Sequence, residues 1–521
     1  MQTNRQKVVF KDYNSNQLLL LPPNLEDLIE SNHPVLIVQQ VIERLDIQPI
    51  LRKYKGGGTS SYHPKMLLKV LVYGYLSNIY SSRKLEAATK ENIHFMWLAG
   101  MSRPDHNTLN RFRSDRLKDV LKEVFSQVVM MLHESGHLDL KEVYTDGTKI
   151  EANANKYTFV WGKAIKTSKE KMSKQLGELW AYTQQLAKEE LCEDPPNFTQ
   201  LEPEKVTQTI EKINQALAGK KVDKKVKQKL GYAKKHWPAK LQEYQQKQEL
   251  LGERNSYSKT DTDATFMRMK EDHMGNGQLK PGYNLQISTH QQFITHFSLH
   301  QKPTDTTTLI PHLEEFKKRY NLLPTCITAD AGYGSEENYH YLATQEESVH
   351  AYIKYPYFHK EQRQAKKKSH RDELLHNLYY DPNKDLYICP MGQKMNRIGT
   401  KRRKTSTGYQ QTSTGYQQTY AVYQAQNCKG CPLAASCKKA KGNKRLEVNW
   451  QLTSYKAQAK ELLLSEEGIK KRKNRPADVE AVFGQLKQNR KFKRFNLRGL
   501  DKTEVEMGLL AIAHNLAKLA A

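Results

Sequence analysis

Cysteine is scarce in this sequence, and long apolar runs are missing from it. Six cysteines among 521 residues are too few for a fold held together by disulfides, which excludes the class of small disulfide-rich secreted domains. No stretch approaches the ~20 apolar residues that cross a bilayer, and the first residues lack the basic, apolar and small-residue succession of a signal peptide. The sequence therefore predicts a soluble, intracellular protein.

Acidic residues are few relative to basic ones. The chain has 56 Asp and Glu against 83 Lys and Arg, which gives a formal net charge of +27 at pH 7. An excess of this size favours a polyanionic partner, because neutralised phosphates release their counterions. Nucleic acid is the first candidate, and an anionic membrane surface is the second.

The spacing of apolar residues divides the chain into modules. Helical spacing predicts an all-α N-terminal domain over residues 1–136 and a helical insert over 162–252. Five β-rich runs, two helices among them, indicate an α/β fold around a mixed sheet. The expected strands are 142–152, 282–290, 292–300, 325–334 and 349–355. The core of the fold is then 137–161, 253–354 and 475–521, with a basic, cysteine-containing insert at 355–474.

Three acidic residues occupy positions where a carboxylate is expected to have a task. Asp146 lies in the middle of the first expected strand, Asp330 directly follows a later strand, and Glu480 lies at the edge of an apolar helical stripe. Taken singly, they could be a turn residue, a helix cap and a surface acid. Because α/β sheets build sites at the carboxyl ends of their strands, the three together favour one metal centre. Hard carboxylate oxygens suit Mg²⁺, and a pair of such ions can act on a phosphodiester.

Two polar residues on neighbouring segments are expected to support this centre. Asn284 lies in the expected strand 282–290, and Asp305 opens the helix that follows the next strand. Asn284 could equally be a cap at the end of its strand. Gly147, directly after Asp146, is expected to leave room beside the carboxylate.

Basic side chains in the N-terminal domain are candidates for DNA contact. The stretch "SRPDHNTLNRFRSDRL" offers Asp105 or Asn107 as a helix cap, with Arg111 and Arg113 on the helix that follows. A basic helix after a short turn is compatible with groove or phosphate contact. A solvated helix face is the ordinary alternative.

A second group of basic residues follows Glu480 in "KQNRKFKRF". The candidates for DNA contact in this segment are Lys487, Arg490 and Arg494. Lys487 and Arg494 come at seven-residue steps, which on a continuing helix places them on the face of Glu480. Phe492 and Phe495 add aromatic surface, so that the segment is interpreted as a DNA-tracking surface.

Four of the six cysteines gather in the second insert. They read Cys389, then Cys428-x2-Cys431-x5-Cys437, with "CPMG" and "CKGCP" as tight turns. This pattern predicts one structural zinc site, which would hold together an insert with little core of its own. Reduced thiols without a metal are the alternative.

In combination, these motifs resemble the DDE transposases of bacterial insertion sequences. The resemblance rests on "DGTKIEANANKYTFVW", "TDTDATFM" with "GYNLQIST", "TADAGYGSEENY" and "VEAVFGQLKQNRKFKRFNLRGL" with "AHNLAKL", and it covers nearly the whole chain. It implies a ribonuclease H-like core with Asp146, Asp330 and Glu480 as the catalytic, metal-binding triad, and Lys487 as the lysine of a Glu-x6-Lys signature that contacts DNA. Arg475 lies one residue further from Glu480 than the arginine of that signature, and no tyrosine matches.

The resemblance also implies a function. A transposase of this kind binds the terminal inverted repeats of its element, cleaves DNA and transfers the 3′ hydroxyl ends to target DNA with two Mg²⁺ or Mn²⁺ ions. It would act as a homodimer on double-stranded DNA, in the bacterial cytoplasm at the nucleoid and without a membrane partner. The alternatives are a catalytically inactive DNA-binding protein derived from a transposase, and a ribonuclease H-like nuclease without strand transfer.

Overall fold

The computed structural model describes residues 24–54, 61–191, 193–198, 201–269, 277–346, 348–362, 378–404 and 415–521. The chain divides into two compact units, Met1–Phe112 with Leu516–Ala521, and Arg113–Asn515. The first unit thus ends earlier than the expected boundary at residue 136. Helix α7 (Leu121–Glu134) belongs to the second unit because Phe125 packs edge-on against Phe297 and Lys122 pairs with Glu315. No helix in the described ranges has the length and apolar character needed to cross a membrane.

The first unit is helical, as its apolar spacing predicts. Its elements are η1 (Leu25–Leu28), α1 (Pro34–Arg44), α2 (Gln48–Leu51), α3 (Pro64–Leu76), α4 (Ser82–Glu91), α5 (Ile93–Leu98) and α6 (His106–Arg111). Helices α1 and α3 both begin at a His-Pro pair, whose imidazole accepts a hydrogen bond from the second residue of the helix. Asp105 caps α6 by accepting a bond of 2.6 Å from the Thr108 amide, so one of the two expected caps is confirmed.

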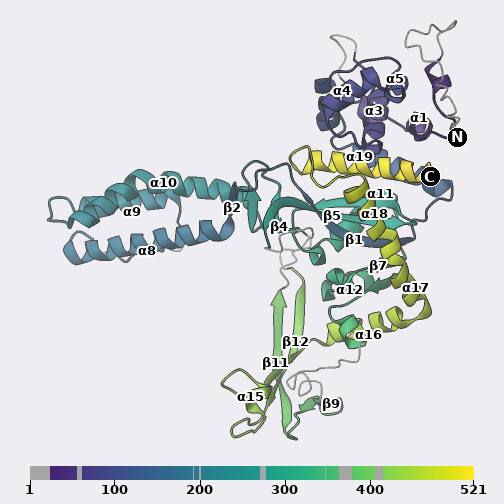
Figure 1. Ribbon diagram of the computed structural model, residues 1–521. Helices are drawn as coiled ribbons and strands as arrows, with labels where there is room; N and C mark the ends of the chain where they lie inside the picture. The colour runs from purple at the N-terminus through teal and green to yellow at the C-terminus, as the bar shows by residue number, and fades with distance from the viewer. Residues whose placement is uncertain are drawn as a thin grey trace, which may run out of the picture. The chain divides into compact units, whose positions relative to one another are not determined.

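The second unit is built on a mixed six-stranded sheet (Figure 1). Its strands are β1 (Glu142–Glu151), β4 (Thr265–Arg268), β5 (Leu279–His290), β6 (Phe293–His300), β7 (Cys326–Ala329) and β8 (His350–Ile353). β5 pairs antiparallel with β1 and β6, whereas β7 runs parallel to both β1 and β8. All five strands expected for the core are present, as are the two intervening helices, α11 (Leu309–Tyr320) and α12 (Glu336–Ala343). This confirms a mixed α/β fold.

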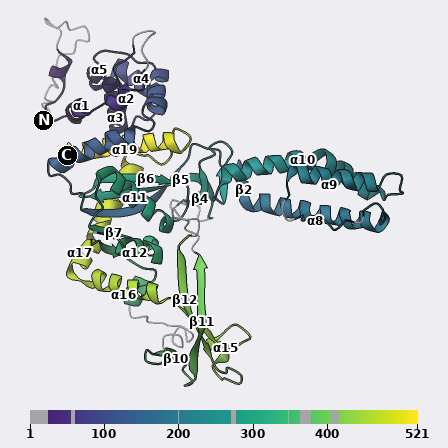
Figure 2. The same ribbon diagram turned by 180° about the vertical axis from the view of Figure 1, so that it is seen from behind.

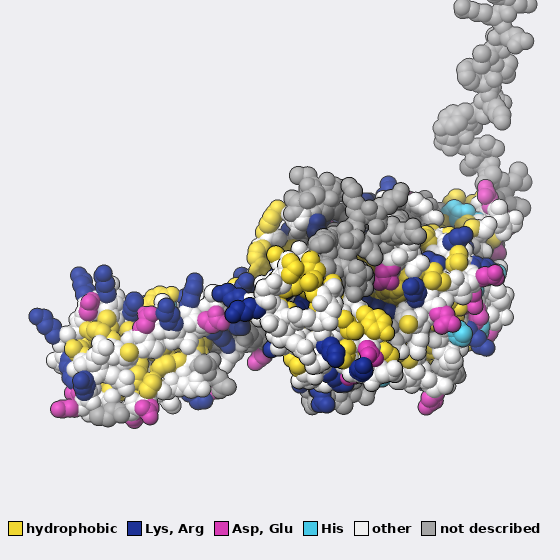
Figure 3. All heavy atoms as spheres, turned by 90° about the horizontal axis from the view of Figure 1, so that it is seen from below, with side chains coloured by type: hydrophobic (Ala, Val, Ile, Leu, Met, Phe, Trp, Pro, Cys, Tyr) yellow, Lys and Arg dark blue, Asp and Glu magenta, His cyan; other side chains and the backbone are white. Residues whose placement is uncertain are grey.

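Three helices make up the first insert: α8 (Gly162–Leu186), α9 (Pro203–Ala216) and α10 (Lys224–Leu251). They enclose a core of their own, with Trp180 and Trp237 buried at its centre. Strands β2 (Phe159–Trp161) and β3 (Ser256–Ser258) pair where the chain leaves and re-enters the central fold. Lys and Arg side chains are spread over the surface of this insert (Figure 3).

The second insert contains a separate antiparallel sheet that its sequence pattern did not predict. Its strands run in the order β13 (Arg445–Val448), β12 (Gln417–Ala425), β11 (Lys394–Lys404), β10 (Leu386–Ile388) and β9 (Tyr379–Asp381). The long pair β11 and β12 lies side by side in both ribbon views (Figure 2). The insert also contains a tandem repeat, "TSTGYQQTSTGYQQ" at 405–418, whose Gly, Ser, Thr and Gln content predicts a flexible hairpin tip. Residues 405–414 of this repeat fall outside the described residues.

The chain returns to the core earlier than expected. Helices α16 (Trp450–Leu464) and α17 (Glu466–Arg475) contact β8 and β7 of the central sheet, so the part of the insert that is separate from the core ends before α16 and not at 474. Then follow a π-helical turn η5 (Pro476–Glu480), α18 (Ala481–Gly484), a second π-helical turn η6 (Gln485–Asn489) and α19 (Leu500–Leu519).

Candidate active site

Strand pairing brings two of the predicted acids together. β1 and β7 are parallel neighbours in which Thr145 pairs with Ala329, and Asp146 and Asp330 are the next residues on their strands. Neighbouring strands lie about 4.8 Å apart, so this register places the two carboxyl groups side by side. The Asp146 side chain is 11% exposed and that of Asp330 is 48% exposed, so that the pair opens to solvent on one side.

One arginine links all three predicted acids. The Arg475 guanidinium donates to Asp146 Oδ2 at 3.0 Å and to Glu480 Oε1 at 2.6 Å, and it lies 4.0 Å from Asp330 Oδ1. The arginine side chain is only 8% exposed, and its Nε has no hydrogen-bond partner. Residues from two strands and one helical segment, far apart in the chain, therefore converge on a single cation.

The π-helical turn explains how Arg475 reaches this position. On an α-helix, residues five apart face directions about 140° apart, which would separate Arg475 from Glu480. Here the Ala481 amide donates to the Pro476 carbonyl five residues back, so the turn contains one residue more than an α-helical turn. The spacing from Arg475 to Glu480 is one residue longer than in the Glu-x6-Lys signature, and the π-helical turn accommodates this added residue. The side chains of Arg475 and Glu480 therefore lie on the same side of the helical segment and bond each other.

A lysine adds a second positive charge. Lys354, which directly follows β8, places its Nζ 3.9 Å from Asp330 Oδ1. Burial lowers the pKa of this lysine, with Asp330 acting in the opposite direction. Its side chain is 13% exposed. The site thus combines three carboxylates with two largely buried cations, Arg475 and Lys354.

A hydrogen-bond network supports the strand behind Asp146. Asp305 Oδ1 accepts from the side-chain amides of Asn284 at 2.9 Å and of Gln286 at 3.2 Å, and Gln286 accepts in turn from the Tyr333 hydroxyl. A Cβ on Gly147 would lie 2.5 Å from the Gln286 amide nitrogen and 2.7 Å from Asp305 Oδ1. The room beside the strand is therefore filled by this network.

The network also fixes the state of its tyrosine. Tyr333 is buried, and burial, together with the charges of Asp146 and Asp305, raises the pKa of its hydroxyl well above the ordinary value. The hydroxyl therefore stays protonated and donates to Gln286. The two polar residues that we expected near the site, Asn284 and Asp305, both lie in this network.

The donor set of the triad fits a divalent hard cation. Its oxygen atoms are those of three carboxylates, which Mg²⁺ and Mn²⁺ prefer, and the structure already places a cationic guanidinium among them. Within the described ranges, no group of three or more His, Cys, Asp or Glu side chains stands ready to hold a metal ion. In the triad, the guanidinium of Arg475 contacts the oxygens that a metal would need.

The basic segment after Glu480 differs from its expected form. The helical segment ends at Asn489, so Arg494 does not lie on a helix face with Glu480 and Lys487, and that prediction is wrong. Arg494 instead donates to the backbone carbonyls of Ala152 and Ala154, at 3.2 Å each, which ties the C-terminal segment to the end of β1.

The aromatic residues of this segment are not available for stacking on bases. Phe492 and Phe495 are 1% and 2% exposed and pack edge-on against each other, so the exposed aromatic surface expected in this segment is not present. Lys487 and Arg490 are half-buried on and directly after η6. They lie on the segment that leads away from Glu480.

The two arginines of the N-terminal region differ in exposure. Arg111, the last residue of α6, is exposed. Arg113 is 3% exposed, so its guanidinium does not reach a DNA surface in this conformation. The basic helix that we expected therefore offers Arg111 and not Arg113 to solvent.

Sequence reasoning missed Gln286, Tyr333 and Lys354 and left Arg475 without a role. Gln286 had a signal, because it lies two residues after Asn284 on the same strand, and two amides on one buried face of a strand require polar partners. Lys354 and Tyr333 had none, since only the packing of β8 and of the turn after Asp330 brings them to the acids.

Two family models match the chain. Residues 388–520 match a model described as a transposase DDE domain, and residues 23–115 match a model described as a transposase domain, DUF772. No curated protein and no solved structure matches the sequence. The first match contains Arg475 and Glu480, whereas Asp146 and Asp330 lie before it.

Proposed function

We propose that this chain, a DDE transposase of the insertion-sequence type by its two family matches, cleaves DNA at the ends of its element and joins the freed 3′ hydroxyls to target DNA. The observation that supports this most strongly is the convergence of Asp146, Asp330 and Glu480 on Arg475. These acids come from three distant parts of the sequence and share one solvent-facing site.

The topology of the sheet supports a ribonuclease H-like core. Apart from the short strand β4, which pairs with the start of β5, the strands β1, β5 and β6 are antiparallel neighbours in chain order, and β7 and β8 extend the sheet in parallel on the other side of β1. Asp146 on the central strand and Asp330 after its parallel neighbour then lie where the sequence resemblance places the first two acids of the triad. Glu480, on a late helical segment that contacts β1 and β5, supplies the third.

The residues of the site have separable tasks. Asp146, Asp330 and Glu480 would hold Mg²⁺ or Mn²⁺, two ions in this proposal, which when bound activate the attacking oxygen and stabilise the leaving oxygen of a phosphodiester. Asp305, Asn284 and Gln286 keep the strand that carries Asp146 in place. Arg475 and Lys354 neutralise the acids and are the nearest cations for a DNA phosphate.

DNA binding follows from charge in this proposal. The net charge of +27 favours association with double-stranded DNA, both terminal inverted repeats and target. Exposed Arg111, together with Lys487 and Arg490 beyond Glu480, are our candidates for phosphate contacts. Because two element ends must be cut and joined together, we propose a homodimer as the active form on DNA.

Cleavage of a labelled candidate terminal repeat tests the triad. We expect Asp146→Asn and Glu480→Gln to lose strand cleavage in Mg²⁺ or Mn²⁺ by at least 100-fold, because each removes a charged oxygen ligand. Asp501→Asn is the matched control, since Asp501 is exposed and pairs with Lys118 away from the triad. Binding of Mn²⁺, followed by electron paramagnetic resonance, should weaken in the two triad variants only.

The products distinguish this function from its alternatives. Nicked and joined products support a transposase. Ends that are hydrolysed but never joined would indicate a nuclease of the same fold, and binding without nicking would indicate an inactive DNA-binding protein. Retained cleavage in Asp146→Asn would contradict the assignment of the triad.

A further inference from the structure

The second insert brings four thiols to one end of its sheet. Cys389 directly follows β10, and the other three lie in the connection from β12 to β13: Cys428, Cys431 and Cys437. Met395 and Ala425 are the last paired residues of β11 and β12 at this end of the sheet. The β10–β11 turn and the end of β12 are therefore adjacent. The Asn427 amide donates to the Gln393 side chain at 3.1 Å and links the two segments.

All four cysteines line one cavity. Its volume is about 30 Å³, room for one or two water-sized occupants, since one water needs ~10–15 Å³ on the same measure. Sites for small organic ligands occupy about 300–1,000 Å³, so this cavity is the size of an ion. None of the four thiols forms a disulfide.

The turns that carry Cys389 and the pair Cys428 and Cys431 are tight and contain left-handed glycines. Gly392 in "CPMG" has φ +74° and its amide donates to the Cys389 carbonyl at 2.8 Å, and Gly430 in "CKGC" has φ +70°. A left-handed glycine lets the chain fold back within four residues. The Lys444 amide donates to Cys428 Sγ at 3.3 Å, a contact that fixes the position of this sulfur.

The insert has reason to need a metal. Among the described residues, the buried cluster of its sheet is small: it consists of Met395, Ala421, Tyr423 and Ala425, against which Cys389 and Cys428 pack. A cluster this small offsets little of the conformational entropy that ordering the insert costs, and a structural metal is one of the means by which small domains offset that cost. A metal held by the four thiols would link the ends of β11 and β12 on the side of Met395 and Ala425.

We propose that this insert binds one Zn²⁺ through the thiolates of Cys389, Cys428, Cys431 and Cys437. Four thiols release four protons to solvent, and four sulfur–zinc bonds form in their place without any change of oxidation state. As the side chains stand, they do not yet form a metal cage, so binding draws the two turns together around the cavity. Four soft thiolate ligands suit the tetrahedral coordination of Zn²⁺, whereas Mg²⁺ and Mn²⁺ prefer the carboxylate oxygens of the acidic triad.

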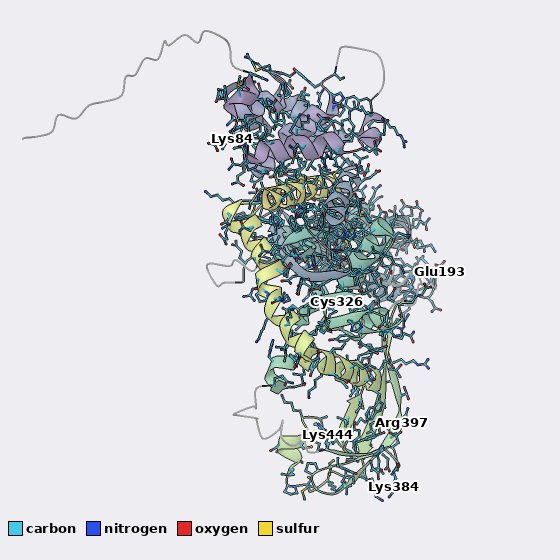
Figure 4. All side chains as sticks on the ribbon, turned by 90° about the vertical axis from the view of Figure 1, so that its right-hand side faces the viewer. Lys84, Glu193, Cys326, Lys384, Arg397 and Lys444 are labelled. Atoms are coloured by element: carbon cyan, nitrogen blue, oxygen red, sulfur yellow. The ribbon has the colours of Figure 1, made fainter. Side chains whose placement is uncertain are left out.

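Metal content of the full-length protein tests the proposal. We expect one zinc per chain by mass spectrometry of the purified protein, and less than one-tenth of an equivalent in Cys428→Ser and Cys431→Ser. Cys326→Ser is the matched control because Cys326 lies on β7 of the central sheet and not on the insert that carries Lys444 (Figure 4). It should retain the full equivalent.

A second measurement needs no variant and therefore does not depend on whether the serine variants fold. After removal of bound metal, addition of Co²⁺ to the wild-type chain should produce the charge-transfer absorption of thiolate-bound cobalt with the intense visible bands of a tetrahedral site. Wild-type protein that holds less than one-tenth of an equivalent of zinc and shows no thiolate–cobalt absorption would overturn the proposal. So would an equal loss of zinc in Cys326→Ser.

Discussion

The Arg475 guanidinium lies among three carboxylates, where a metal ion would otherwise balance their charge, and this position affects the stability of the fold. The guanidinium neutralises Asp146, which is almost buried, and also contacts the half-exposed Glu480. Removing one partner of a buried ion pair leaves the other uncompensated, at a cost of roughly 3–5 kcal/mol, whereas exposed pairs contribute little. Most of the effect of Arg475 on stability is therefore exerted through Asp146.

We expect Arg475→Gln to lower the free energy of unfolding by about 3 kcal/mol without metal, because Asp146 loses its partner. Mg²⁺ or Mn²⁺ should then stabilise this variant more than the wild type, since metal no longer competes with the guanidinium. At a hundred times its Kd, a ligand contributes about 2.7 kcal/mol. Melting temperatures with and without metal provide the measurement.

Arg472→Gln is the control for this comparison. Arg472 lies one helical turn away on α17, where its guanidinium stacks over Phe358 and makes no ion pair with the three acids. Its response to metal should match that of the wild type. Equal stabilisation of Arg475→Gln and wild type by Mg²⁺ would show that the arginine and the metal do not compete.

At the scale of single residues, the sequence predicted the acids better than their surroundings. Asp146 and Asp330 attract attention because one lies within a β-rich run and the other directly follows one, and the register of β1 and β7 makes them neighbours. Arg475 could not be placed, because a count of residues along an assumed α-helix misplaces it by one. Gln286 was overlooked although its strand position is equivalent to that of Asn284.

Among the elements, the strand β11 has two faces of different electrostatic character. On one face Lys401 and Arg403 both pair with Glu447 of β13. Successive side chains of a strand alternate between faces, so Arg402 and Lys404 lie on the other face, where they meet no acidic side chain among the described residues. That face is the more favourable one for a DNA backbone.

We expect the double change Arg402→Ala with Lys404→Ala to weaken binding to non-specific double-stranded DNA. Each phosphate that the protein no longer neutralises should reduce the slope of log Kd against log salt concentration by about 0.9, hence by about two for the pair. The matched control is Lys401→Ala with Arg403→Ala, which removes the same charge from the face that Glu447 already neutralises. Fluorescence anisotropy at several salt concentrations measures both, and equal slopes would mean that only total charge matters.

Elements with strong periodicity were predicted well, and those without it were not. The strands 282–290 and 292–300 correspond to β5 and β6 because each carries buried residues throughout. The sheet β9–β13 escaped prediction because β11 exposes almost every side chain and reads as a basic run. The helical segment after Glu480 was extended too far, since nothing in "QNRKFKRF" signals its end at Asn489.

At the scale of the whole second unit, a cluster of buried histidines makes the folding stability depend on pH. His296 and His312 are buried, and His312 bonds the hydroxyls of Ser288 at 2.8 Å and Ser298 at 2.7 Å. Burial lowers the pKa of both, and lowers that of His300 to about 4. The charged groups facing them are Glu315, Lys122 and Arg319.

These shifts predict a loss of stability in acid. The unfolded chain takes up protons near pH 6.5, whereas the folded chain resists them until a lower pH, so stability is complete above about pH 6.5 and decreases as pH falls toward 4. The slope should be roughly 1 kcal/mol per pH unit for each such histidine. We expect His300→Gln to have a smaller decrease in melting temperature from pH 7 to pH 5 than the wild type. An unchanged slope in this variant would contradict the role of His300.

The division of the whole chain into modules was only partly accessible from sequence. The helical insert between β2 and β3 was clear from its apolar spacing, and its three helices have their own core. The boundaries at 136 and 474 stay predictions, because α7, α16 and α17 look in the sequence like parts of the neighbouring modules and contact strands of the central sheet only through tertiary packing. Contacts between segments that are hundreds of residues apart cannot be recognised from the local spacing of apolar residues.

The π-helical turn at Pro476–Glu480 bears on how proteins of this kind are compared. A motif written as fixed letter counts treats one added residue as a break, yet the backbone here takes up that residue and returns the arginine to the acids. In this chain the arginine still meets the acids in space, although the count of residues between Arg475 and Glu480 is one more than the motif asks. Relatives that differ in this count can therefore share one chemistry, and an alignment that opens a gap at residues 476–479 preserves more of it than one that keeps the columns unbroken.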